Sequence, residues 1–197
     1  MKITSQMVKE LRDKTNAGMM DCKKALTETE GEMEKAVDLL RQKGLAVAQK
    51  RADRATSQGV VESYIHAGSK LGVLVEVGCE TDFVAKTDDF IAFAKDIAMH
   101  IAASNPVAVT REEVPAEIVD RERDIYKAQA LESGKPENIV DKIISGKIDK
   151  YISEIALMEQ KFVKNPDLSI QDLLNELIAK MGENISIKRF ARFQIGG

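Results

Sequence analysis

Three strand-like segments, two adjacent and one far along the chain, constrain the fold most. Residues 59–78 alternate as two strands around the turn 67–70, and residues 185–195 give a third strand. An amphipathic helix over about 89–103 follows the hairpin, and helical patterns occupy most of 116–180 before the last strand. This order predicts an α+β fold in which a small three-stranded antiparallel sheet packs with helices.

The last strand is expected to have one apolar face and one polar face. Its apolar residues share one parity: Ile185, Ile187, Ala191, Phe193 and Ile195. Arg189 interrupts this face and is therefore expected near an edge or a binding surface.

Residues 1–55 predict a compact bundle of three short helices with alanine, methionine and leucine faces. Thr4 is the expected N-cap of the first helix, and the second helix is expected to begin at Met19. Gly44 is expected to end the third helix as a C-cap. A polar linker follows, so the chain is predicted to divide into a bundle, 1–55, and an α+β core, 56–197.

Two amphipathic helices, about 117–132 and 137–158, are joined by the short turn 133–136. Helices joined by so short a turn run antiparallel, so we expect a helical hairpin inserted into the core over about 116–160. The apolar face of its first helix is expected to be Ile118, Ile125 and Leu131. A last helix is predicted from Ile170 to Lys180.

Composition narrows the classes of partner and compartment. The net charge is −3, which gives no general attraction to nucleic acid, and no apolar run is long enough to span a membrane. Two cysteines, Cys22 and Cys79, do not make a disulfide framework. The N-terminal residues lack a signal-peptide core. We therefore expect a cytoplasmic protein that binds neither nucleic acid nor membrane directly.

Enzymatic motifs are missing from the sequence. It has no P-loop and no GxGxxG after a strand, and its histidines, His66 and His100, form no metal-spaced cluster with the cysteines. A Cys79–His66 nucleophile pair is conceivable, although an ordinary core or surface histidine is the commoner role. The acidic pair 88–89 beside Asp82 fits a cation site or simply the start of a helix. We expect no catalytic residue, metal or cofactor.

Two apolar features stand in polar surroundings. Phe83 lies within Glu80–Lys86, where the chain leaves a strand, and it either folds into the core or projects as a probe. Met19 and Met20 follow Gly18 at a helix start. Because adjacent helical residues do not share a face, one of the two is expected to be exposed as a contact for another protein.

These same features resemble the signatures of the translation elongation factor Ts family. Lys9–Leu26 is similar to that family's N-terminal motif, and the Thr-Asp-Phe-Val segment, 81–84, is similar to its second signature. Ile97–Ser104 and the segment 133–136 resemble later parts of the family. The resemblance covers essentially the whole chain.

The resemblance implies a guanine nucleotide exchange factor for elongation factor Tu in translation elongation, without bond-making chemistry. Asp82 and Phe83 would enter the GTPase near its magnesium and nucleotide, while Thr81 and Val84 shape the turn. His66 resembles a position near the other domains of the GTPase.

The resemblance also assigns a role to the bundle. It implies a ubiquitin-associated-like (UBA-like) module that docks on the GTPase domain through Arg12, Met19 and Met20. The alternative is a protein-binding adaptor that uses this bundle and has no exchange activity.

Longer family members carry two related core subdomains, whereas this chain shows one. A short chain could recover the missing half by pairing with itself, so we expect a homodimer through the core sheet or its helices. Residues 185–197 contain no cysteine, and the dimer is therefore expected to be noncovalent. A bacterial cytoplasm is the expected location.

Overall fold

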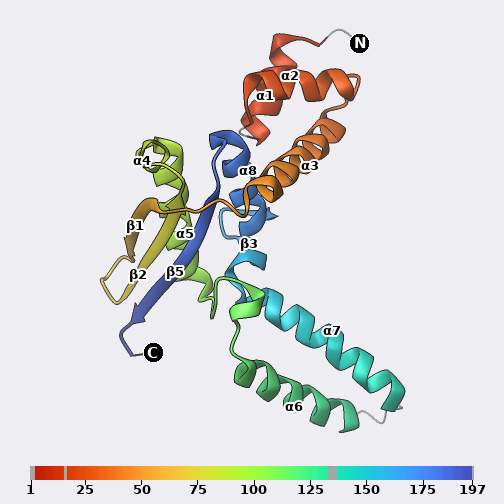
Figure 1. Cartoon of the computed structure of the whole chain (residues 1–197). Coiled ribbons are helices and arrows are strands. Elements are labelled where there is room, and N and C mark those ends of the chain that lie inside the picture. Colours follow the sequence, from red (N-terminus) through yellow and green to blue (C-terminus); the bar gives the residue numbers. More distant parts are fainter. Residues whose placement is uncertain (1–2, 16, 133–136, 197) are drawn as a thin grey trace. The chain divides into compact units, whose positions relative to one another are not determined.

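The structure, a computed structural model, describes residues 3–15, 17–132 and 137–196. Its described part is α+β, as the sequence predicts, with helices and a three-stranded sheet (Figure 1). The chain divides into two compact units, which are described separately. The first comprises Met1–Glu62, Val75–Asp96 and Gln171–Lys188, and the second comprises Ser63–Leu74, Ile97–Ile170 and Arg189–Gly197.

The three-stranded sheet has the order β1-β2-β5, with β2 in the centre. Its strands are β1 (Gln58–Ile65), β2 (Leu71–Cys79) and β5 (Ile185–Gln194). The N–H of His66 donates to the carbonyl of Leu71 (2.9 Å) and closes the predicted hairpin. The N–H of Ile195, just after β5, donates to the carbonyl of Lys70, just before β2 (2.9 Å).

Burial along β5 does not follow the single parity that the sequence predicts. Ile185 and Ile187 are buried, but Phe193 and Ile195 are 68% and 73% exposed. The guanidinium of Arg192 instead donates to the carbonyl of Ala102 (3.3 Å from Nη2). The in–out alternation therefore changes phase after Lys188, an effect typical of one extra residue in a strand.

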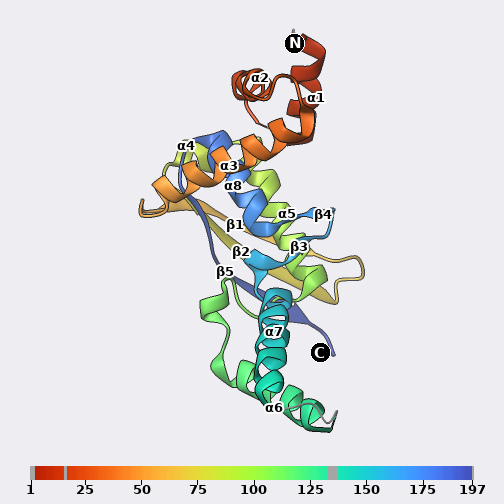
Figure 2. The same ribbon diagram turned by 90° about the vertical axis from the view of Figure 1, so that its right-hand side faces the viewer.

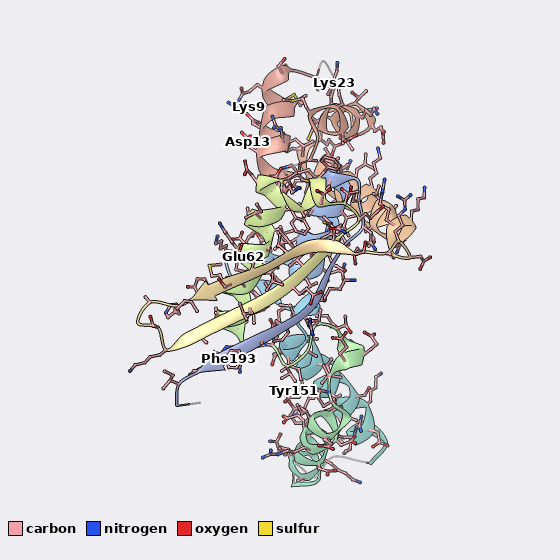
Figure 3. The ribbon with its side chains drawn as sticks, turned by 60° about the vertical axis from the view of Figure 1, so that its left-hand side comes forward. Lys9, Asp13, Lys23, Glu62, Tyr151 and Phe193 are labelled. Atoms are coloured by element: carbon pink, nitrogen blue, oxygen red, sulfur yellow. The ribbon has the colours of Figure 1, made fainter. Side chains whose placement is uncertain are left out.

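A three-helix bundle forms the N-terminal part of the first unit, as predicted. It consists of α1 (Ser5–Thr15), α2 (Met19–Glu28) and α3 (Met33–Arg51) (Figure 2). The hydroxyl of Thr4 accepts from the N–H of Met7 (3.3 Å), which confirms the predicted N-cap. The buried core of the bundle is Val8, Leu11, Cys22, Ala25, Leu26 and Ala36. Charged residues such as Lys9, Asp13 and Lys23 lie on its exposed surface (Figure 3).

Gly44 does not end the third helix, so this prediction is wrong. Helix α3 continues to Arg51, and Gly44 is buried within it. A Cβ on Gly44 would lie 3.7 Å from both the Cβ of Ala179 and the carbonyl oxygen of Asn175, which belong to α8 (Ile170–Met181). These are ordinary van der Waals distances, so Gly44 lies inside a helix that packs on α8 and does not terminate it.

One long helix follows the β1–β2 hairpin and the short α4 (Asp82–Ala85). It is α5 (Asp88–Ser104), within one residue of the predicted range at each end. The hydroxyl of Thr87 accepts from the N–H of Phe90 (3.3 Å) and caps it. As expected of an amphipathic helix, it has a buried apolar face, namely Phe90, Phe93, Ala94, Ile97, Ala98 and Ile101.

The second unit contains the predicted helical hairpin, α6 (Ala116–Glu132) and α7 (Glu137–Ile155) (Figure 1). Its described packing residues are Val119, Tyr126, Ala130, Val140, Ile144, Ile148 and Ile152. The contact face of α6 thus starts one residue later than predicted, and Ile125 is 42% exposed. The predicted turn 133–136 and the side chain of Leu131 lie outside the described residues. Within the described chain, no helix is long and apolar enough to cross a membrane.

A short two-stranded sheet after α7 was not predicted. It contains β3 (Lys161–Phe162) and β4 (Asn165–Ser169), preceded by the 3₁₀ turn η2 (Leu157–Glu159). A second 3₁₀ turn, η1 (Arg111–Glu113), provides Arg111, whose guanidinium bonds both oxygens of Glu159 and also pairs with Asp149. These segments are too short to carry a periodic signal.

His100, on α5, is fully buried in a polar cluster of the second unit. Its Nε2 lies 2.9 Å from Oε1 of Gln160, whose Nε2 donates to the carbonyl of Glu154 (2.7 Å). The Nδ1 of His100 accepts from the N–H of Val163 (3.4 Å). This pattern requires a neutral ring with its proton on Nε2, and burial lowers the pKa of His100.

Acid is therefore expected to destabilise the fold through His100. Because its folded pKa lies below the unfolded value, its contribution is present above about pH 6.5 and is lost as pH falls toward the folded pKa, by at most about 1.4 kcal/mol per pH unit. Urea unfolding at pH 7 and pH 5 measures this loss, and His100→Gln should reduce it.

The comparison with His100→Gln is essential because another group, Glu176, changes the stability with pH in the opposite direction. Burial and the neighbouring charge of Asp172 raise the pKa of Glu176 to about 7, so its contribution is lost as pH rises from 4.5 toward 7. The contribution of Glu176 is the same in the wild type and in His100→Gln, so it cancels when the two are compared. His66→Gln, at an exposed histidine, is the matched control. Identical losses in wild type and His100→Gln would contradict this assignment.

Candidate functional site

The Thr-Asp-Phe-Val segment forms a single helical turn, α4, directly after β2. Thr81 is extended (φ −125°, ψ 155°), and its hydroxyl accepts from the N–H of Val84 (3.4 Å) as an N-cap. Val84 and Ala85 are buried, whereas Phe83 is 80% exposed. Of the two alternatives for this aromatic, the structure therefore shows the projecting one.

Asp82 lies beside Phe83 on the exposed side of the turn. Its carboxylate accepts from Nζ of Lys86 (2.7 Å), one helical turn later, and both side chains are well exposed. This hydrogen bond and the lysine charge lower the pKa of Asp82. Exposed pairs of this kind are weak, so the carboxylate is charged and can exchange its partner at low cost.

Two carboxylates that the sequence does not single out, Glu183 and Glu80, form hydrogen bonds that fix the backbone at the start of this turn. Glu183, between α8 and β5, accepts from the N–H of Thr81 (3.0 Å) and from its hydroxyl (2.7 Å). Glu80 accepts from the N–H of Asn184 (2.6 Å) and pairs with Arg54 (3.3 Å). The Asn184 N–H, followed by the arginine, lowers the pKa of Glu80. Thr81 and Glu183 are 102 positions apart, and Glu80 and Asn184 are 104 positions apart, so no local pattern predicts these contacts.

The conceivable nucleophile pair gains no support. Cys79 is buried, its thiol donates to the carbonyl of Thr81 (3.1 Å), and burial raises its pKa, which disfavours the reactive thiolate. His66 is exposed, with Nδ1 3.0 Å from the hydroxyl of Tyr64. Among the described residues, no group of three or more histidine, cysteine or acidic side chains could hold a metal ion.

The second set of candidate residues lies on the bundle. Met19 and Met20 are 48% and 62% exposed, so both are accessible where only one was expected. They form the first turn of α2, before Cys22, the first residue of this helix in the bundle core. Arg12, on α1, is also exposed. The bundle and the α4 turn belong to the first compact unit, whereas His66 belongs to the second.

Comparisons with known proteins agree with the resemblance to the elongation factor Ts family. The family model described as Elongation factor TS matches residues 1–197. Elongation factor Ts of Desulfotalea psychrophila is 74% identical over 196 residues, covering the whole of both chains. Elongation factor Ts of Desulfosudis oleivorans is 63% identical over 98% of each chain, and that of Geobacter sulfurreducens is 64% identical over this whole chain and 91% of its own. The chain belongs to the elongation factor Ts family.

Proposed function

We propose that this protein is the guanine nucleotide exchange factor of elongation factor Tu in translation elongation. Family membership supports the role, and the single observation that carries it on this chain is Phe83. A large aromatic side chain that is 80% exposed, on a capped turn with a buried base, is typical of a contact made with a partner.

The mechanism follows from how a GTPase holds its nucleotide. GDP is bound largely through its phosphates and Mg²⁺, so insertion of Asp82 and Phe83 beside the magnesium lowers the affinity for both. Linkage then requires that the nucleotide weaken binding of the factor by the same ratio. Such a factor makes and breaks no covalent bond, and it needs no catalytic acid, base, metal or cofactor of its own.

The bundle is the proposed docking module. We assign 1–55 as a UBA-like domain whose contacts with the GTPase are Arg12, Met19 and Met20. Methionine adapts its shape to a partner, so the exposed pair provides apolar area, and the exposed Arg12 on α1 provides a charge. His66, exposed at the end of the β1–β2 hairpin, is a further proposed contact.

The double variant Met19→Ala/Met20→Ala is expected to raise the factor concentration needed for half-maximal exchange about tenfold or more. The maximal rate should stay the same, because docking is separate from disturbance of the magnesium site. Leu45→Ala on α3, at a residue 46% exposed, is the matched control. A fall in the maximal rate alone would contradict a docking role.

Release of fluorescent GDP from elongation factor Tu, chased with unlabelled GDP, tests the proposed function. Strong acceleration by this protein is the expected result. A folded protein that binds the GTPase without accelerating release would instead support the adaptor alternative.

A second copy of the chain is the other proposed partner. The open face of the sheet in the second unit carries four exposed apolar side chains, namely Ile65, Leu74, Phe193 and Ile195. A Cβ on Gly72 would lie 3.0 Å from Cδ1 of Ile65, so Ile65 shares the face of Gly72 and Leu74. Arg192 donates to the carbonyl of Ala102 in α5, so its side chain lies on the α5 side of the sheet. Because successive side chains of a strand alternate, Phe193 lies on the side away from α5 (Figure 3).

This apolar face, Ile65/Leu74/Phe193/Ile195, is suited to isologous pairing. Two copies related by a two-fold axis can pack the same sheet face against each other. The dimer is proposed to be noncovalent, since Cys22 and Cys79 are both buried. We propose a cytoplasmic protein without a direct nucleic-acid or membrane partner.

A further inference from the structure

Glu183 makes the closest polar contacts with the start of the α4 turn. One carboxylate oxygen accepts from the backbone N–H of Thr81 at 3.0 Å, and the other accepts from its hydroxyl at 2.7 Å. Both residues are half-buried. Hydrogen bonds to a charged acceptor are stronger than neutral ones, and two of them from one residue fix its position and its rotamer.

The hydroxyl of Thr81 links Glu183 to the turn itself. This hydroxyl has one hydrogen, which it donates to Glu183, so its lone pairs are left to accept from the N–H of Val84 (3.4 Å). The cap of α4 is thus oriented by a residue 102 positions away in the chain. Without Glu183, the hydroxyl is free to rotate and the cap weakens.

Glu80 and Asn184, the neighbours of Thr81 and Glu183, make a second connection, in which the carboxylate belongs to the segment before the turn. Glu80 accepts from the N–H of Asn184 at 2.6 Å, and the side-chain amide of Asn184 donates to the carbonyl of Arg54 at 2.7 Å. The pair 80–81 is therefore joined to the pair 183–184 by three hydrogen bonds. This brace fixes the backbone from which the turn projects.

We propose that Glu183 is a positioning residue for nucleotide exchange, which holds Thr81 so that Phe83 is presented in one orientation. The inference rests on the exchange role proposed above. Phe83 is 80% exposed and packs little, so its direction is set by the backbone of the turn rather than by its own contacts. Preorganised contacts lose less entropy on binding, and small displacements of a reactive group are costly.

Exchange kinetics with Glu183→Ala and Glu183→Gln, each alone and combined with Phe83→Ala, test the proposal. Glu183→Ala should lower the maximal acceleration of GDP release about tenfold, the loss expected for one charged hydrogen bond. Glu183→Gln keeps one acceptor for the Thr81 N–H and should fall between wild type and Glu183→Ala. In the Phe83→Ala background, neither change should lower the rate further.

Several controls separate positioning from general damage. Urea unfolding establishes that each variant is folded, and Glu112→Ala, at an exposed residue of η1, should match wild type. Hydrogen exchange of the Val84 amide, measured without the partner, should be faster in Glu183→Ala. An equal loss of rate with and without Phe83, or no loss at all, would overturn the positioning role. Failure of the wild-type protein to accelerate release would overturn the exchange function itself.

Discussion

Phe83→Ala is expected to lower the maximal acceleration of GDP release by roughly thirtyfold or more, the loss typical of an interfacial hot spot. The ring is the largest apolar group that the turn presents, and it stands beside the charge of Asp82. The substitution leaves the capped backbone of α4 intact but removes the side chain proposed to insert beside the magnesium. Stopped-flow release of fluorescent GDP at saturating factor measures the effect.

Folding should be almost unaffected, because Phe83 is 80% exposed and buries little area. The melting temperature of Phe83→Ala should therefore match that of the wild type. Val163→Ala, at another exposed apolar residue outside the turn, is the matched control and should retain full exchange. A folded Phe83→Ala protein with an unchanged maximal rate would remove the central support for the proposed mechanism.

Local patterns account for what the sequence predicted well. The periodicity of each of these elements lies within one contiguous segment: the three bundle helices, the hairpin strands, α5 and α8. Thr4 adds a local cap signal. The turn at 81–84 was found because an aromatic among charged residues at a strand end is unusual. These features need no knowledge of tertiary contacts.

Other features escape the sequence because they depend on residues distant in the chain. The local sequence around Gly44 resembles a helix end, because it does not show that Ala179 of α8 packs against α3 at this point. The phase change in β5 has no counterpart in its own apolar alternation, which continues to Ile195. The brace from Glu183 to Thr81 is a contact between two ordinary polar residues, for which neither composition nor spacing gives a signal.

Phe193→Asp is expected to abolish the proposed homodimer. In a two-fold interface each copy would bring a carboxylate to the same apolar face, where the charges are desolvated and repel each other. The dissociation constant should rise at least about a hundredfold, which corresponds to the cost of several kcal/mol for like charges at an interface. Sedimentation equilibrium over a range of protein concentrations measures it.

Two control variants show whether the effect is specific to this face, and both should retain the dimer. Phe193→Leu retains an apolar side chain and should retain the dimer, whereas Gln194→Asp adds the same charge at the next residue, which alternates to the opposite side of β5. If pairing supplies the missing core subdomain, Phe193→Asp should also lose exchange activity, although Phe193 is not part of the α4 turn. A wild-type protein that stays monomeric at high concentration, or a dimer that survives Phe193→Asp, would show that the open face serves another partner. A monomer with full exchange activity would show that one core subdomain is sufficient.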